Sequence, residues 1–196
     1  MRQRGLLDRD ESVLVVVDLQ PGFLSREWFS QIDHDAADSA AERAGWLVAL
    51  AVRLGVPVVV TEEEPERHGP TAARAAEHLP HDTRRFRKPT FGLTRTCEIA
   101  EAVRATGRTS AVLVGCETDV CVAQSAVGLA AGGFDCTVVE DATFSPGEMH
   151  ERGLVRVASA GVSRNHAKGV AYEWLASVDD AHSVLPTLPA PPFRLF

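Results

Sequence analysis

The chain has 196 residues and a formal net charge of −7 at neutral pH, with 45% hydrophobic and 24% charged residues. This composition is ordinary for a globular protein, and the length suits a single domain, residues 1–196, with a sizeable core. The acidic balance argues against a nucleic-acid-binding protein, because such proteins usually present basic surface to phosphates. The densest basic stretch, RRFRK at 84–88, is typical of solvated surface.

The chain carries no sign of a membrane or secretory protein. No apolar run approaches the roughly 20 residues that a transmembrane helix needs. Residues 1–12, MRQRGLLDRDES, contain no long apolar segment, so we expect no secretory signal. Four cysteines in such a chain indicate reduced thiols and a cytoplasmic location.

Strands and helices alternate along the chain. SVLVVVDLQ at 12–20 predicts a strand buried on both faces, because valine-rich runs are typical of parallel sheets. Alanine-rich residues 36–54 predict a helix that ends at Gly55. The same reasoning predicts further strands at 56–61, 83–88, 109–115, 134–141 and 162–166. It predicts further helices at 71–79, 94–106, 120–133, 147–160 and 169–177.

This alternation predicts an α/β fold, a three-layer α/β/α sandwich with a mostly parallel six-stranded sheet and right-handed crossovers. The tail, residues 183–196, is rich in proline and cannot continue a helix. We expect it to be frayed or to lie against a partner subunit. This apolar tail, together with Trp28 and Phe29, gives weak support for a homo-oligomer.

Several polar residues follow predicted strands. In open α/β sheets, ligands collect at the carboxyl ends of the strands. This rule selects Asp18, Thr61–Glu62, Lys88, 115–121 and Asp141. We therefore expect an acid, a lysine and a cysteine to converge at one edge of the sheet.

Cys121, in GCETDVCVAQSA at 115–126, lies where a strand turns into a helix. Unpaired N–H groups and the helix dipole at such a position stabilise thiolate over thiol. A nucleophile is one interpretation of Cys121, and a buried packing residue is the other. Cys97, Cys116 and Cys136 are expected to be small buried side chains. No second Cys or His pair has zinc-site spacing, so we expect no metal.

A nucleophilic thiol needs a base and a group that stabilises developing negative charge. None of the seven histidines lies at the carboxyl end of a predicted strand, so Asp18 is the better candidate for the base. Lys88 would keep Asp18 ionised and help to stabilise a thiolate. A plain ion pair at the edge of the sheet is the alternative for these two residues.

Three segments resemble the isochorismatase-like cysteine hydrolases: VVVDLQPGF, RKPTFGLT and LVGCETDVCVAQSAVGLAAGGFDCTVVEDATFS. The resemblance extends over residues 13–178, which we take as the core of the domain, and implies a three-layer fold with a parallel sheet. The family includes nicotinamidases, N-carbamoylsarcosine amidohydrolases and uncharacterised isochorismatase-domain proteins. VTEEEPERHGPT resembles the TEQ-x-P pattern of the uncharacterised branch.

The resemblance implies a catalytic triad of Asp18, Lys88 and Cys121. It also implies a cis peptide bond between Cys116 and Glu117, with the N–H groups of Glu117 and Cys121 forming an oxyanion hole. Candidate substrate-binding residues, with core packing as an equal interpretation for the two phenylalanines, are Gln20, Phe23, Glu62 and Phe91.

Departures from the family patterns bear on the substrate. The nearest match to the nicotinamidase metal motif is DHD at 33–35, in a different arrangement, so we expect no metal and no other cofactor. The cysteine favours hydrolysis of a small amide, ureido or related C–N substrate through a thioester. Two alternatives stay open: a vinyl ether hydrolase with Asp18 as general acid, and a non-catalytic oligomeric binding protein. Family members are usually oligomers, so we expect a homo-oligomer that binds neither nucleic acid nor membranes.

Overall fold

The computed structural model describes residues 5–25 and 33–194. Trp28, Phe29 and the last two residues of the tail lie outside the described residues. Six described strands form one sheet in the order β3-β2-β1-β4-β5-β6, and all of their pairings are parallel. The strands are β1 (Ser12–Val17), β2 (Val58–Glu62), β3 (Arg85–Arg87), β4 (Ser110–Cys116), β5 (Asp135–Phe144) and β6 (Ser163–Asn165). The predicted α/β fold with a six-stranded parallel sheet is confirmed.

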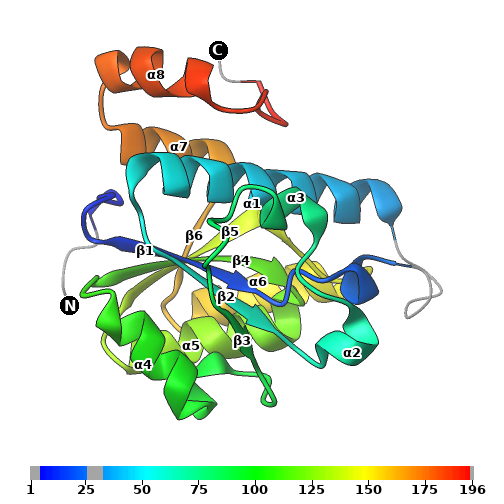
Figure 1. Cartoon of the computed structure of the whole chain (residues 1–196). Coiled ribbons are helices and arrows are strands. Elements are labelled where there is room, and N and C mark those ends of the chain that lie inside the picture. Colours follow the sequence, from blue (N-terminus) through cyan, green and yellow to red (C-terminus); the bar gives the residue numbers. More distant parts are fainter. Residues whose placement is uncertain (1–4, 26–32, 195–196) are drawn as a thin grey trace.

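Helices cover both faces of the sheet (Figure 1). One face is covered by α1 (His34–Leu54) and α7 (Ala167–Leu175). On the same side, α3 (Ala73–Ala76) packs against α1 and α8 (Val178–Val184) packs against α7. The other face carries α4 (Cys97–Ala105), α5 (Ala123–Ala131) and α6 (Met149–Ser159). The remaining helical segments are short: α2 (Pro65–His68), η1 (Pro21–Leu24), η2 (Leu93–Arg95), η3 (Thr118–Val122) and η4 (Leu185–Thr187).

Strand β1 separates two apolar cores. Its side chains alternate between the faces of the sheet, as in any strand. Leu14 and Val16 pack in the core beneath α1 and α7, whereas Val13, Val15 and Val17 pack in the core beneath α4, α5 and α6. Because both faces are covered, the strand is valine-rich and buried along its whole length.

The helix boundaries follow local sequence signals where those signals are strong. Asp33 caps α1 by accepting a hydrogen bond from the Ala36 N–H at 3.1 Å, and α1 ends at Gly55 with φ of +73°. The helix expected at 71–79 is only the single turn of α3. None of the helices in the two described ranges is long and apolar enough to cross a membrane.

The described part of the tail does not fray: it packs on α1 of its own chain, where Trp46 Nε1 donates to the Pro189 carbonyl at 3.1 Å and the Phe193 ring meets the Trp46 ring edge-on. Contact of the tail with a partner subunit stays a prediction. The expectation for Cys97 is wrong, because this residue is exposed at the start of α4, whereas Cys116 and Cys136 are buried as expected.

Asp141 does not belong to the edge of the sheet where ligands were expected. Strand β5 continues beyond it to Phe144. The Asp141 carboxylate accepts a hydrogen bond from the Ala167 N–H at 2.7 Å and lies 3.4 Å from Nε of Arg43. Asp141 therefore links β5 to α1 and α7.

Candidate active site

Asp18, Lys88 and Cys121 lie together at the carboxyl ends of β1, β3 and β4. Lys88 Nζ is 2.8 Å from Asp18 Oδ2 and 3.5 Å from Cys121 Sγ. Asp18 and Lys88 are fully buried, and Cys121 is 2% exposed. The convergence comes from the parallel register, in which Val17 pairs with both Thr61 and Gly115.

The backbone at the end of β1 directs Asp18 into the site. Asp18 has φ of +45°, a left-handed conformation that residues other than glycine rarely adopt. Its N–H donates to the Thr61 carbonyl at 3.1 Å, and its Oδ1 accepts from Thr61 Oγ1 at 2.7 Å. Gly115 is required beside it, because a Cβ there would lie 1.9 Å from the Val17 carbonyl oxygen. Backbone conformations of this kind cluster at functional sites.

Cys121 is carried by an unusual turn rather than by the first turn of a regular helix. The peptide bond between Cys116 and Glu117 is cis. The next residues form η3, one π-helical turn in which the Val122 N–H donates to the Glu117 carbonyl at 3.0 Å. Regular α-helix begins only at Ala123. Single π-helical turns of this kind are frequent at functional sites.

Glu63 is a site residue that the sequence analysis missed. The Cys121 thiol donates to Glu63 Oε2 at 3.2 Å, and the same oxygen lies 3.5 Å from Lys88 Nζ. The Glu63 side chain is 18% exposed, so it is the most accessible charged group that contacts the thiol. The available signal was its position: Glu63 stands where the TEQ-x-P pattern has glutamine.

Gln20 and Glu62 support the loop that carries Glu63. Gln20 is fully buried; its Nε2 donates to the carbonyls of Glu63 and Gly69 at 3.0 and 2.5 Å, and its Oε1 accepts from the Glu63 N–H at 2.7 Å. Glu62 accepts from the N–H and Oγ1 of Thr71 at 2.7 and 2.5 Å. Both amide atoms of Gln20 and Oε1 of Glu62 are thus bonded to partners other than the thiol.

The two phenylalanines occupy different environments. Phe23 is 6% exposed and stacks on His68, with ring centroids 4.4 Å apart, in the core beneath α1. Phe91 is 55% exposed, in the loop where the Thr90 carbonyl accepts a hydrogen bond from Lys88 Nζ at 2.7 Å. Phe23 is therefore a packing residue, and Phe91 lies at the surface near the lysine.

Burial and charge oppose one another at Asp18 and Lys88. Burial raises the pKa of Asp18, and the neighbouring Lys88 ammonium limits the rise. Burial alone would lower the pKa of Lys88, but the charges of Asp18 and Glu63 help to raise it above its ordinary value. Lys88 is consequently a fixed cation between the acid and the thiol.

Burial and the neighbouring carboxylates favour the protonated form of the Cys121 thiol. Burial raises its pKa above the ordinary value, and the charges of Asp18 and Glu63 raise it further, against the effect of Lys88. Lys88 acts in the direction expected from the sequence and favours thiolate, but burial of the sulfur and the two carboxylates act against it and raise the pKa.

Two further acidic residues lie on the segment that leads into Cys121. Burial raises the pKa of Glu117 to about 7, and the nearby charges of Asp119 and Glu63 contribute. Asp119 is only partly buried and accepts a hydrogen bond from Ser145 Oγ at 2.6 Å. We call Glu63, Glu117 and Asp119 the acidic rim.

The buried donors could in principle hold a metal. One ligand atom each from Asp18, Glu63 and Cys121 lies within 4.8 Å of the others. However, Lys88 Nζ is within 3.5 Å of all three side chains and places its own positive charge among them. These residues therefore fit an internal ammonium better than a divalent ion.

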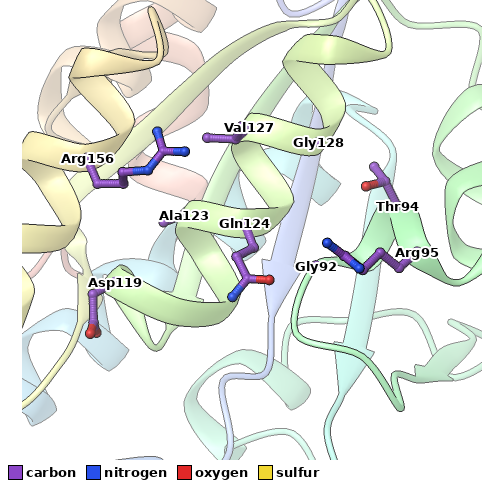
Figure 2. A pocket seen from close by; sticks show the side chains of 9 residues that line it. All are labelled: Gly92, Thr94, Arg95, Asp119, Ala123, Gln124, Val127, Gly128 and Arg156. Atoms are coloured by element: carbon purple, nitrogen blue, oxygen red, sulfur yellow. The ribbon is translucent and has the colours of Figure 1, made fainter.

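A separate groove of about 610 Å³ runs along the outer face of α5. Figure 2 shows Thr94 and Arg95 on one side of this helix and Arg156 on the other. Asp119 and Gln124 line it as well, but Cys121 does not. The groove is thus a neighbour of the buried site.

Comparison with known proteins identifies the family. The isochorismatase domain matches residues 12–165. The chain is 29% identical over 178 residues to isochorismatase domain-containing protein 2 of Xenopus laevis, covering 89% of this chain and 81% of the relative. It is 28% identical to the probable hydrolase YcaC of Escherichia coli K12, covering 85% and 79%.

A solved structure agrees with this assignment. The crystal structure of the Escherichia coli ycaC gene product, described as an octameric hydrolase of unknown specificity, superimposes with a TM-score of 0.84 at 26% identity. The superposition covers 95% of this chain and 90% of that one. With its fold, its ordered motifs and a domain match over most of its length, the chain belongs to the isochorismatase-domain family.

Proposed function

We propose that the chain is a cysteine-dependent hydrolase of a small amide, ureido or related C–N substrate. Membership of the isochorismatase-domain family supports hydrolase activity in general. The observation that carries the finer proposal is the buried row of Asp18, Lys88 and Cys121, in which one ammonium contacts both the acid and the thiol.

The first half-reaction forms a thioester. Asp18 accepts the proton of Cys121, and the sulfur attacks the carbonyl carbon as the C=O π electrons move to oxygen. The N–H groups of Glu117 and Cys121 stabilise this oxyanion. As the carbonyl re-forms, the C–N bond breaks, and Asp18 returns the proton to the departing nitrogen.

The second half-reaction restores the enzyme. Asp18 removes a proton from water while the water oxygen attacks the thioester carbon. The C–S bond then breaks, an acid product leaves, and the sulfur takes back a proton from Asp18. Lys88 stays charged throughout and stabilises whichever neighbour carries the negative charge.

The raised pKa of Cys121 is compatible with this chemistry. A thiolate of high pKa is a stronger nucleophile than one of low pKa, although less of it exists at neutral pH. Transfer of the proton to a buried carboxylate supplies the thiolate only when a substrate is in position. The same carboxylate, with its own raised pKa, can hold the proton until the nitrogen leaves.

A product assay tests the proposal. A panel of small primary amides and carbamoyl compounds is incubated with the protein, and ammonia release is followed together with the intact mass of the enzyme. We expect ammonia, and an acyl adduct on Cys121 under rapid quenching. Full turnover by Cys121→Ala would exclude the nucleophile, and pyruvate from isochorismate without ammonia would establish the vinyl ether alternative.

Self-association is part of the same proposal. The Escherichia coli relative is described as octameric, and we expect this chain to assemble as well. Light scattering coupled to size-exclusion chromatography gives the mass directly, and a particle of 21.1 kDa at micromolar concentration would refute the expectation.

A further inference from the structure

We propose that Glu63 and Glu117 make this site selective for substrates with a positive charge, such as a small amide or ureido compound bearing an ammonium or guanidinium group. The inference rests on the proposed function, since it concerns the substrate of the same thiol. It goes further by assigning a specificity role to two residues outside the triad.

Glu63 is held in a fixed position beside the sulfur. Gln20 clamps its backbone from both sides, with the Glu63 N–H donating to Oε1 and the Glu63 carbonyl accepting from Nε2. Glu64, the next residue, has φ of +37°, so the chain turns sharply directly after Glu63. A carboxylate fixed in this way keeps its oxygen 3.2 Å from Cys121 Sγ, where a substrate carbonyl has to arrive.

The charges around the thiol do not balance. The Lys88 ammonium is closest to Asp18, at 2.8 Å, and reaches Glu63 only at 3.5 Å. One cation therefore faces two carboxylates in the buried site. Asp119 lies at the rim as well, and Glu117, whose pKa is raised to about 7, is only partly ionised at neutral pH. In a partly desolvated site an excess carboxylate attracts cations and repels anions strongly.

Among the described residues, Arg95 and Arg156 line the groove along α5 together with Asp119 of the acidic rim, and Cys121 is not part of that groove. His150 Nδ1 lies 2.9 Å from Thr118 Oγ1, and burial lowers the pKa of this histidine, so it favours the neutral form. The described charged groups that contact the Cys121 thiol or its partner ammonium are thus two carboxylates, Asp18 and Glu63, and one cation, Lys88.

Charged thiol reagents measure this field without any knowledge of the substrate. Aminoethyl, methyl and sulfonatoethyl methanethiosulfonate carry a positive, a neutral and a negative group. In each, the thiolate attacks the sulfur, a mixed disulfide forms and methanesulfinate leaves. The protein carries Cys97→Ser, because Cys97 is exposed, and labelling of Cys121 is followed by intact mass and peptide mapping.

The readout is the rate with the cationic reagent divided by the rate with the anionic one, normalised to the same ratio for 2-mercaptoethanol. Because both rates come from one protein, changes in the intrinsic reactivity of the thiol cancel. We expect a normalised ratio of about 10 or more, because an excess carboxylate near the thiol attracts the cationic reagent and repels the anionic one. Glu63→Gln should lower the ratio several-fold, and Glu117→Gln should lower it less.

Glu64→Gln is the matched control. It removes the same charge one residue along the chain, from a side chain that is 54% exposed and pairs with Arg67. Solvent screens such a charge, so the ratio should change by less than about twofold.

The outcomes separate the two proposals. A normalised ratio of one or below, or a ratio that Glu63→Gln leaves unchanged, overturns the selection of cations and leaves the hydrolase proposal standing. Failure of all three reagents to label Cys121 overturns both, because a nucleophile has to be reachable by small electrophiles. A high ratio that falls in Glu63→Gln and not in Glu64→Gln supports the inference.

Discussion

Glu63 Oε2 accepts a hydrogen bond from Cys121 Sγ at 3.2 Å, although the two residues lie on different segments that follow β2 and β4. This contact gives the thiol a second carboxylate neighbour besides Asp18. The resting site is therefore an acidic cluster around one ammonium, and the thiol is neutral in it. In the proposed mechanism the thiolate therefore forms by proton transfer during the reaction.

The ionisation of Cys121 is the first quantity to measure. Burial and two carboxylates raise its pKa above the ordinary value of 9.0. We expect the ultraviolet absorbance of the thiolate, taken as the difference between Cys97→Ser and Cys97→Ser/Cys121→Ala, to show no step near neutral pH. Glu63→Gln should move the step to lower pH. A step below about pH 7 in the parent protein would contradict the assignment of a neutral thiol.

The convergence of Asp18, Lys88 and Cys121 could be predicted from the sequence because it depends on topology alone. Buried valine runs identify parallel strands, and parallel strands place their carboxyl ends at one edge. The same rule failed for Asp141, because β5 extends past it to Phe144, which lies just before the breaker residues Pro146 and Gly147. Site residues predicted from strand ends are therefore correct only where the end of the strand is placed correctly.

The contact of Glu63 with the thiol could not be predicted, because it depends on the direction in which a side chain points after its strand has ended. Glu62 and Glu63 are adjacent and chemically identical, and neighbouring side chains in extended chain point to opposite sides. The structure turns Glu62 to Thr71 and Glu63 to the thiol. The pKa of Cys121 was missed for the same reason, since it depends on burial and on this contact.

Removal of the buried cation should destabilise the fold. Lys88→Met leaves Asp18 and Glu63 without their shared partner, so we expect a loss of about 3–5 kcal/mol in the free energy of unfolding. Adding Asp18→Asn should recover part of that loss, because it removes one uncompensated charge. Urea denaturation of both single variants and the double variant measures the coupling. Strictly additive effects would mean that the two side chains do not form a pair in solution.

Gln20 should act on selectivity only through Glu63. Gln20→Leu leaves the Glu63 N–H and two carbonyls without their partners in a buried position, at a cost of about 1–3 kcal/mol for each group that water cannot reach. The freed loop should lower the cationic-to-anionic labelling ratio of Cys121 even though Glu63 is still present. A destabilised protein with an unchanged ratio would show that the clamp does not position Glu63.

Stability should decrease with pH through Glu117. Its pKa is raised from 4.5 to about 7, so between these values the folded state holds a proton that the unfolded state has lost. The free energy of unfolding therefore falls as pH rises through this window, and the contribution is fully present only below it. Because Glu117 is only half-buried, solvent screening reduces the expected change to the order of 1 kcal/mol.

Urea denaturation of the parent and Glu117→Gln between about pH 5 and pH 8 should show the parent losing stability relative to the variant. Glu77→Gln, which removes a carboxylate that is 64% exposed, is the control. A difference between parent and Glu117→Gln that stays constant, or that grows in favour of the parent as pH rises, would contradict the raised pKa and weaken the case for Glu117 in the acidic rim.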